Sequence, residues 1–289
     1  MNTLLYWLGR TLIAFIQALP LSLVARLGRF FGALAHRLDA RHRQVTIDNL
    51  TLCFGQEKSA EEIRAIAREN FCRIGENMLC GIKTAGMSFE QLRPHLEFAG
   101  AMALPKKNGD EPLPNFVFAI GHFGNFELYA RFQSLCPGYQ LATTYRALKQ
   151  PGINRLMQEM RIQSGCLFFE RRSEGAQLRA AMGRGGVLLG LLGDQSSTGL
   201  RAPFLGHDCN TGLAPAVLAL RYGCELYTAF CFRTELAKWR LELGDKVPTH
   251  ENGQPRSSEA IMREVNLSYE KAVRRDPANW FWVHRRWKV

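Results

Sequence analysis

A histidine and a glutamate stand five residues apart in the stretch FVFAIGHFGNFELYA. His122 follows a short apolar run that is typical of a buried strand, and Gly121 and Gly124 give the chain the freedom to turn after it. Asn125 is a good N-cap for a helix that begins at the next residue. Glu127 then falls in the first helical turn, where the helix dipole favours a negative charge. The pattern therefore predicts a strand, a tight turn and a helix that bring His122 and Glu127 together.

A contact between these two side chains would suit acid–base chemistry. Residues five apart on a continuous helix face different directions, so the two side chains can meet only across the turn. The Glu127 carboxylate would then hold the His122 imidazole in one tautomer and leave its other ring nitrogen free to accept a proton. No serine or cysteine stands close by in sequence as a nucleophile. The pair is interpreted as a general base that activates a hydroxyl or water directly; the alternative is a surface histidine beside a glutamate that only caps a helix.

The elements around this turn follow from apolar patterning. The runs NFVFAI, QLATTY, CLFFE, GVLLGLLG and CELYTAFCF are apolar on both faces, which is typical of buried strands in a mainly parallel sheet. A capping box at Ser59 predicts a helix to about Lys83. This alternation predicts an α/β fold with a mixed, mainly parallel sheet flanked by helices. Further helices are expected at about 126–135, 151–164, 174–183, 212–222 and 258–275.

Polar residues follow four of the predicted strands. His122, Arg146, Arg171 and the pair Asp194-Gln195 all stand at strand ends. Because ligands of open α/β sheets bind outside the carboxyl ends of the strands, these residues predict a single pocket.

Roles can be assigned to the other polar residues of this pocket. Arg146, Arg161 and Arg171 could hold phosphates of either an acceptor or a donor, because the arginine fork binds phosphate through two hydrogen bonds. The alternative for all three is a solvated surface charge, which for Arg161 is equally favoured. Asp194 and Gln195 would bind sugar hydroxyls or support the pocket. The turn amides of Gly124 and Asn125, or a strand-end arginine, would stabilise an oxyanion.

Composition narrows the class of protein. The 289 residues carry a formal net charge of +11, which favours an acidic partner: nucleic acid, an anionic membrane, a phosphorylated substrate or an acidic protein. The chain is 46% hydrophobic and 22% charged, which excludes a disordered protein. Eight cysteines show no C-x-x-C or zinc-ligand spacing, so we expect reduced, buried thiols.

The N-terminal segment, residues 1–43, is mostly apolar up to Val24 but is interrupted by Arg10, Gln17 and Pro20. It is therefore not a clean spanning helix. Arginines follow it where a signal peptide would have its cleavage site. The segment is predicted to be helical and membrane-associated, with Tyr6 and Trp7 in the headgroup zone. The alternative is an amphipathic helix packed on the protein's own core.

The motifs together resemble a known family. GHFGNFE resembles the His-x4-Asp/Glu motif of glycerolipid acyltransferases, and more closely that of the late, lauroyl/myristoyl-type acyltransferases of lipid A biosynthesis. Four further stretches resemble blocks of that family: RHRQVTIDNLTLCFG with GEN, TYR with Asn154, GDQ with APFLGHDCNTG, and DPANWFWVHRRWK. The resemblance covers nearly the whole chain and implies that residues 44–289 form an α/β acyltransferase domain.

The resemblance also implies partners and a location. The expected enzyme lies on the cytoplasmic face of the inner membrane and needs no metal or cofactor. It would take an acyl chain from acyl carrier protein, or alternatively from acyl-CoA, and transfer it to a phosphorylated glycolipid, the lipid A precursor. Two other functions remain open: acylation of another membrane lipid, and non-catalytic binding of membranes or nucleic acid. The aromatic and basic C-terminus fits either membrane anchoring or nucleic-acid stacking; the resemblance favours a packed, partly lipid-facing segment and no nucleic acid.

Overall fold

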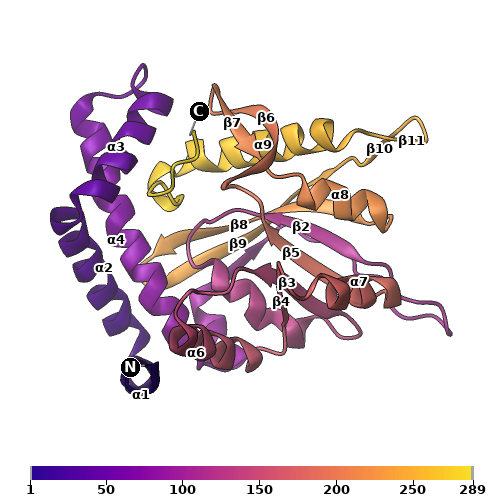
Figure 1. The fold of residues 1–289 in the computed structure, drawn as a ribbon, viewed down its shortest axis with the longest axis horizontal. Coiled ribbons are helices and arrows are strands. Elements are labelled where there is room, and N and C mark those ends of the chain that lie inside the picture. The colour runs from indigo at the N-terminus through magenta and orange to yellow at the C-terminus, as the bar shows by residue number, and fades with distance from the viewer. Residues whose placement is uncertain (1, 288–289) are drawn as a thin grey trace.

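A seven-stranded sheet lies at the centre of the molecule (Figure 1) in a computed structural model, which describes residues 2–287. The five predicted strands are parallel neighbours within it, β9 runs antiparallel to β8, and β1 pairs parallel with β9 at the edge. The predicted mixed, mainly parallel α/β fold is confirmed. The strand order is β1 (Leu96–Ala99), β9 (Lys238–Val247), β8 (Glu225–Glu235), β2 (Phe116–Ile120), β5 (Val187–Leu192), β3 (Gln140–Tyr145) and β4 (Leu167–Glu170).

Helices cover both faces and one end of this sheet. Figure 1 shows α1 to α4 on one side of the sheet, with α8 and α9 above it. The bounds are α1 (Asn2–Ala18), α2 (Leu21–Leu38), α3 (Ala40–Phe54), α4 (Ala60–Ala85), α5 (Phe89–Leu92), α6 (Pro151–Ile162), α7 (Gly175–Arg184), α8 (Ala214–Arg221) and α9 (Ser258–Arg275), with 3-10 helices η1 (Arg93–His95), η2 (Phe126–Leu135) and η3 (Pro277–Asn279). Short hairpins pair β6 (Ser196–Phe204) with β7 (His207–Thr211), and β10 (His250–Glu251) with β11 (Gln254–Pro255).

Local signals explain where the helices begin. The Ser59 side chain accepts from the Glu62 amide, and the Glu62 side chain accepts from Ser59, so the predicted capping box starts α4. The segment after His122 differs from the prediction, because residues 126–135 form a 3-10 helix and Asn125 does not cap it. The Asn125 side chain is buried and donates instead to Thr84 Oγ1 of α4, at 3.4 Å. Because the Asn125 side chain packs against α4, it does not accept a hydrogen bond from the first amides of the 3-10 helix.

The core has a main layer and a second, smaller one. Alternate residues of β2, β5 and β8 pack with α7, α8, α9 and the C-terminal tryptophans. On the opposite face, β8 and β9 pack against α2, α4 and η2 around Trp239 and Leu128, whereas Phe116 of β2 and Leu188 of β5 pack with Tyr139 in a small additional cluster. All eight cysteines are free thiols, and all except Cys136 are buried. The parallel strands are thus covered on both faces, as their apolar character requires.

Helix α2 lies tightly against α4. A Cβ atom added at Gly28 would fall 2.6 Å from the Gly75 carbonyl oxygen, and one at Gly32 would fall 2.2 Å from that of Phe71. These glycines therefore let the two helix backbones approach closely. The predicted boundary between residues 43 and 44 falls inside α3. Met1, which begins the first predicted segment, and Lys288 and Val289, which end the second, lie outside the described residues.

The outer surface of α1 and α2 is apolar. Large exposed side chains gather on these two helices: Leu4, Trp7, Leu8, Leu12, Phe15, Phe30, Phe31, Leu34 and Leu38. Tyr6 differs from its predicted place in a headgroup zone, because it is buried and its hydroxyl donates to Glu159 of α6. Within residues 2–287, no helix combines the length and the apolarity needed to cross a bilayer.

Candidate active site

The chain turns sharply after β2, as predicted. Gly124 has a φ of +51°, and a Cβ atom there would fall 2.5 Å from the Cys231 carbonyl oxygen, so only glycine fits this turn. The Gly124 amide donates to the Asn279 carbonyl at 3.2 Å, and the Asn125 amide donates toward the Cys231 sulfur. Both predicted oxyanion donors are therefore already bonded within the protein.

Asp194, not Glu127, holds the imidazole of His122. The His122 Nδ1 atom lies 2.6 Å from Asp194 Oδ1, and the His122 backbone amide donates to Asp194 Oδ2 at 2.7 Å. The Trp280 indole Nε1 also donates to Oδ2, at 2.7 Å. The predicted contact with Glu127 is corrected by these bonds, because the parallel register of β2 and β5 brings the residues that follow each strand together.

The environment of Asp194 keeps it charged. The residue is fully buried, and burial alone would raise the pKa of its carboxyl group. The His122 imidazole opposes this effect, and with the hydrogen bonds from His122 and Trp280 it brings the pKa of Asp194 below its ordinary value. A charged carboxylate at Nδ1 makes that nitrogen the donor, so the proton of a neutral His122 ring resides there.

The second ring nitrogen of His122 faces an open cavity. Gln195 Nε2 lies 3.4 Å from His122 Nε2, and the imidazole packs edge-on against Phe126 and at a tilt against Phe281. The His122 side chain is 15% exposed, enough to reach a ligand in the cavity. With Nδ1 donating to Asp194, Nε2 is the nitrogen free to accept a proton.

The cavity in front of His122 has a volume of about 530 Å³. This size falls in the usual range for small-molecule sites. One stripe of α4, from Asn70 to Ala85, forms its floor, which corresponds to roughly 22 Å of helix at about 1.5 Å per residue. Most of its walls are apolar, with Ile74, Met78, Met157 and Met160 among them. It is therefore a long cavity suited to an apolar chain.

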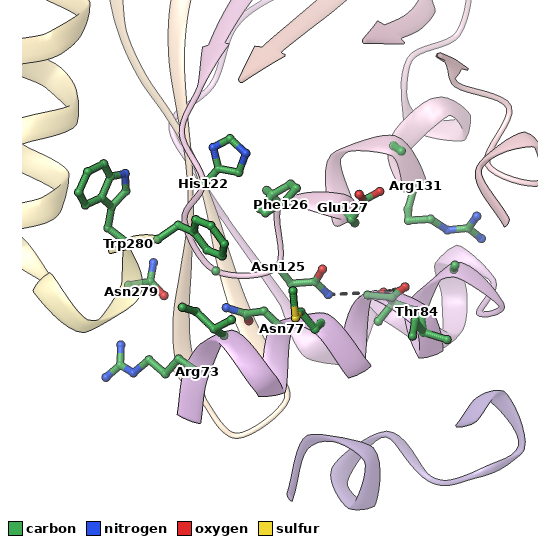
Figure 2. A pocket seen from close by; sticks show the side chains of 18 of the residues that line it. Arg73, Asn77, Thr84, His122, Asn125, Phe126, Glu127, Arg131, Asn279 and Trp280 are labelled. Carbon is green, nitrogen blue, oxygen red and sulfur yellow. Dashed lines mark hydrogen bonds between the residues drawn. The ribbon is translucent and has the colours of Figure 1, made fainter. Parts of the chain in front are cut away.

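Glu127 makes an ion pair at another wall of this cavity. Arg161 of α6 donates to Glu127 Oε1 at 2.7 Å, and its guanidinium lies over the rings of Phe168 and Tyr145. In Figure 2, His122 and Glu127 stand on either side of Phe126 and belong to the same cavity. The structure thus brings two polar pairs into one cavity: His122 with Asp194, and Glu127 with Arg161.

The remaining predicted site residues divide into two groups. Gly124, Asn125 and Gln195 line the cavity, whereas Asp194 is buried behind the histidine. Arg146 and Arg171 do not line it; both are exposed at the ends of β3 and β4. The prediction of one pocket at the strand ends therefore holds for β2 and β5 and is wrong for β3 and β4.

Trp280 and Arg131 are among the lining residues of the cavity that were not predicted. Trp280 comes from the aromatic C-terminal motif, whose pattern could have drawn attention to it. Arg131 of η2 lines the cavity and donates to the Met87 carbonyl, while its Nε and one terminal nitrogen are buried without a hydrogen-bond partner among the described residues. Burial lowers the pKa of Arg131. No local sequence signal marked this arginine.

Comparison with known proteins decides the family. The model of the bacterial lipid A biosynthesis acyltransferases matches residues 1–289. The chain belongs to this family. Similar proteins include the lipid A biosynthesis palmitoleoyltransferase of Escherichia coli (strain K12) and the lipid A biosynthesis acyltransferase of Shigella flexneri. Each is 25% identical over 297 residues, which cover 99% of this chain and 91% of the relative. The strand-end histidine and the long apolar cavity therefore belong to an acyltransferase of lipid A biosynthesis.

Proposed function

We propose that the protein transfers a fatty acyl group from a thioester donor to a hydroxyl of a lipid A precursor, with His122 as the general base. One observation carries the proposal: His122 Nδ1 is held by the buried Asp194 carboxylate, while Nε2 faces a long apolar cavity. A base so placed can act on a hydroxyl beside a bound acyl chain.

The catalytic groups of the proposed reaction are side chains of this protein. His122 Nε2 takes the proton of the acceptor hydroxyl as its oxygen attacks the thioester carbonyl carbon. The tetrahedral oxyanion then collapses, the carbon–sulfur bond breaks, and the thiolate leaves with the proton from His122. Asp194 stabilises the imidazolium between these two transfers. Catalysis by such a positioned base contributes roughly 10²- to 10⁴-fold.

The oxyanion requires a donor other than the turn amides, because these are already bonded. Gln195 is the best placed, since its side-chain nitrogen lies 3.4 Å from the base. A donor at this position stabilises charge that develops next to the reacting hydroxyl. Arg161 is the second candidate, because its Nε is buried without a hydrogen-bond partner among residues 2–287. We assign the oxyanion to Gln195, and to Arg161 a positioning role that Glu127 fixes.

Charge supports an acidic donor. Acyl carrier protein is the donor we propose, and the net charge of +11 favours an acidic protein as well as a phosphorylated acceptor. Steady-state transfer from acyl carrier protein and from acyl-CoA, measured in parallel, decides between the two donors. A higher kcat/KM with acyl-CoA would contradict this part of the proposal.

We also propose that the outer surface of α1 and α2 lies on the cytoplasmic face of the inner membrane. The apolar side chains there are exposed, and arginines such as Arg26 and Arg37 stand on the same helices. Flotation with vesicles tests this placement. The variant Leu8→Asp/Phe15→Asp should lose most of its vesicle binding, whereas Leu267→Asp, at an exposed leucine on α9, should keep it. Equal binding by both variants would contradict the placement.

The base assignment is tested by His122→Ala. We expect the rate of acyl transfer to fall roughly 10²- to 10⁴-fold, the usual contribution of a general base. His250→Ala is the matched control, because His250 is exposed in the short β10–β11 hairpin. Thermal unfolding of each variant shows whether it is folded. Near-normal turnover by a folded His122→Ala protein would rule out the proposed base.

A further inference from the structure

A second, smaller cavity is lined by residues from α3, the start of β6 and the C-terminal segment. Its volume is about 270 Å³. Arg41 and His42 reach it from the start of α3, His284 and Arg285 reach it from the C-terminal segment, and Ser196 reaches it from the start of β6. Two motifs that lie about 240 positions apart in the chain thus contribute basic side chains to one place.

The walls of this cavity are fixed relative to each other, because hydrogen bonds join the two segments that form them. The buried Asn49 side chain on α3 donates to the backbone carbonyls of Trp282, at 2.9 Å, and of His284, at 2.8 Å. Trp282 also packs edge-on against Phe54 of the same helix. The C-terminal segment is therefore fixed against α3, and the basic side chains of the two segments face one space.

Asp39 offsets the charge of this basic cavity only in part, because it pairs with His42 and lies within electrostatic range of Arg41. Neither Arg41 nor Arg285 forms an ion pair with a carboxylate in the part of the chain that the structure describes. The carboxylate at the edge is Asp39, which caps α3 and lies 2.6 Å from His42 Nδ1. The neighbouring Arg286 is different, because it is fully buried and bonds to Asn266. Arg286 thus has a structural role, whereas Arg41, Arg285 and Ser196 can bind an anion.

The position of the cavity indicates which anion it takes. Ser196 directly follows Gln195, whose side chain contacts His122. Val283, which also lines the basic cavity, stands two residues after Phe281, whose ring packs on His122. Neighbouring residues of the same two segments therefore line the two cavities: Gln195 and Phe281 line the apolar cavity that we assign to the acyl chain, and Ser196 and Val283 line the basic cavity.

We propose that this cavity binds a phosphate monoester of the acceptor glycolipid, through Arg41 and Arg285, and so places the acceptor hydroxyl at His122. The inference rests on the proposed function, and it names the part of the site that recognises the acceptor. A guanidinium pair binds phosphate through several charge-assisted hydrogen bonds. Headgroups of membrane phospholipids and free phosphate carry the same chemistry, so the experiment separates these sources.

The test uses the variant Arg41→Gln/Arg285→Gln. Its matched control is Arg179→Gln/Arg184→Gln, which removes the same charge from exposed positions on α7. Acyl transfer is measured in neutral detergent micelles at a saturating concentration of donor, with the phosphorylated acceptor and with the same acceptor after phosphatase treatment. We expect the first variant to lose at least tenfold in kcat/KM on the phosphorylated acceptor, mostly through KM, and to match the wild type on the dephosphorylated one.

Three results would overturn the assignment. The first is an unchanged kcat/KM on the phosphorylated acceptor. The second is an equal loss on both acceptors, which would indicate a general defect. The third is a loss that appears only when anionic phospholipid is added to the micelles, which would assign the cavity to membrane headgroups.

A binding measurement separates this inference from the proposed function. Inorganic pyrophosphate should raise the melting temperature of the wild type and of the α7 control, but not that of Arg41→Gln/Arg285→Gln. If the wild type transfers no acyl chain to either acceptor yet shows this protection, the anion site stands and the proposed function has failed. If transfer occurs and pyrophosphate protects all three proteins equally, the function stands and the anion site has failed.

Discussion

Two carboxylates in the same region differ in what surrounds them. Asp194 is fully buried and accepts hydrogen bonds from His122 and Trp280. The Glu127 side chain is 34% exposed and is paired with Arg161. The carboxylate five residues from the histidine thus binds an arginine, while one 72 residues away holds the imidazole. Proximity in the chain did not decide the pairing; the register of two neighbouring strands did.

The difference assigns separate tasks to the two pairs. A buried carboxylate that accepts a hydrogen bond from the imidazole can fix its tautomer and stabilise an imidazolium. A partly exposed carboxylate that binds a guanidinium can fix that arginine and, through it, the helix that carries it. Helix α6 contributes Met157 and Met160 to the cavity as well as Arg161. The Glu127–Arg161 pair therefore positions a wall of the cavity, and we expect the two pairs to fail in different ways.

Of the two carboxylates, Asp194 is expected to give the larger effect, on substitution by Asn. An amide at this position can accept from Nδ1 less well and offers no charge to an imidazolium, so the rate constant should fall roughly 10³-fold while KM changes little. The measurement is kcat for acyl transfer at saturating donor and acceptor. Asp208→Asn, at an exposed aspartate on β7, is the control. A loss of less than about fivefold in folded Asp194→Asn would break the comparison, because Asp194 would then not serve the base.

A smaller effect is expected for the second pair. Glu127→Gln and Arg161→Gln should each lower kcat/KM roughly 10- to 100-fold, as expected for a partly buried charge pair that orients a substrate site. The double variant should lose no more than either single variant, because each change already breaks the same ion pair. If Glu127→Gln instead reduced kcat as much as Asp194→Asn, and Arg161→Gln did not, Glu127 would have to act on the imidazole after all.

The sequence was sufficient to predict the strands that carry the site. Apolar runs placed His122 and Asp194 at strand ends, and glycines predicted the turn after β2. The pairing of His122 with Asp194 was missed because it depends on register: Ile120 of β2 is opposite Leu192 of β5, so the residues two positions further on also meet. No local pattern specifies the register of two parallel strands that lie 70 residues apart.

The floor of the cavity was missed for a related reason. The capping box predicted α4 itself, but nothing in its sequence indicates that it crosses the site at the ends of β2 and β5. That placement depends on contacts with distant segments, such as the approach of Gly28 to Gly75 and the hydrogen bond from Asn70 to the Trp280 carbonyl. Helix periodicity shows which face is apolar, but not which partner covers it.

The smallest expected effect concerns stability in acid. The pKa of Asp194 is lower in the folded protein than the ~3.9 of an unfolded chain, so its charged form stabilises the fold above that pH, and this stability is lost as pH falls through the folded pKa. Asp194→Asn should lower the free energy of unfolding by about 1–3 kcal/mol at pH 7.

The gap between the two proteins should begin to narrow below about pH 4, where the carboxylate of the unfolded wild-type chain takes up a proton, and should keep narrowing until the folded carboxylate is protonated at lower pH. Urea unfolding at several pH values, followed by circular dichroism, measures this gap. The exposed Asp110 is the control position, where Asn should leave the free energy of unfolding unchanged across the range. A gap that stays constant from pH 7 to pH 3 would mean that the charge on Asp194 does not stabilise the fold. Asp194 and the partly exposed Glu127 would then differ in their geometry alone.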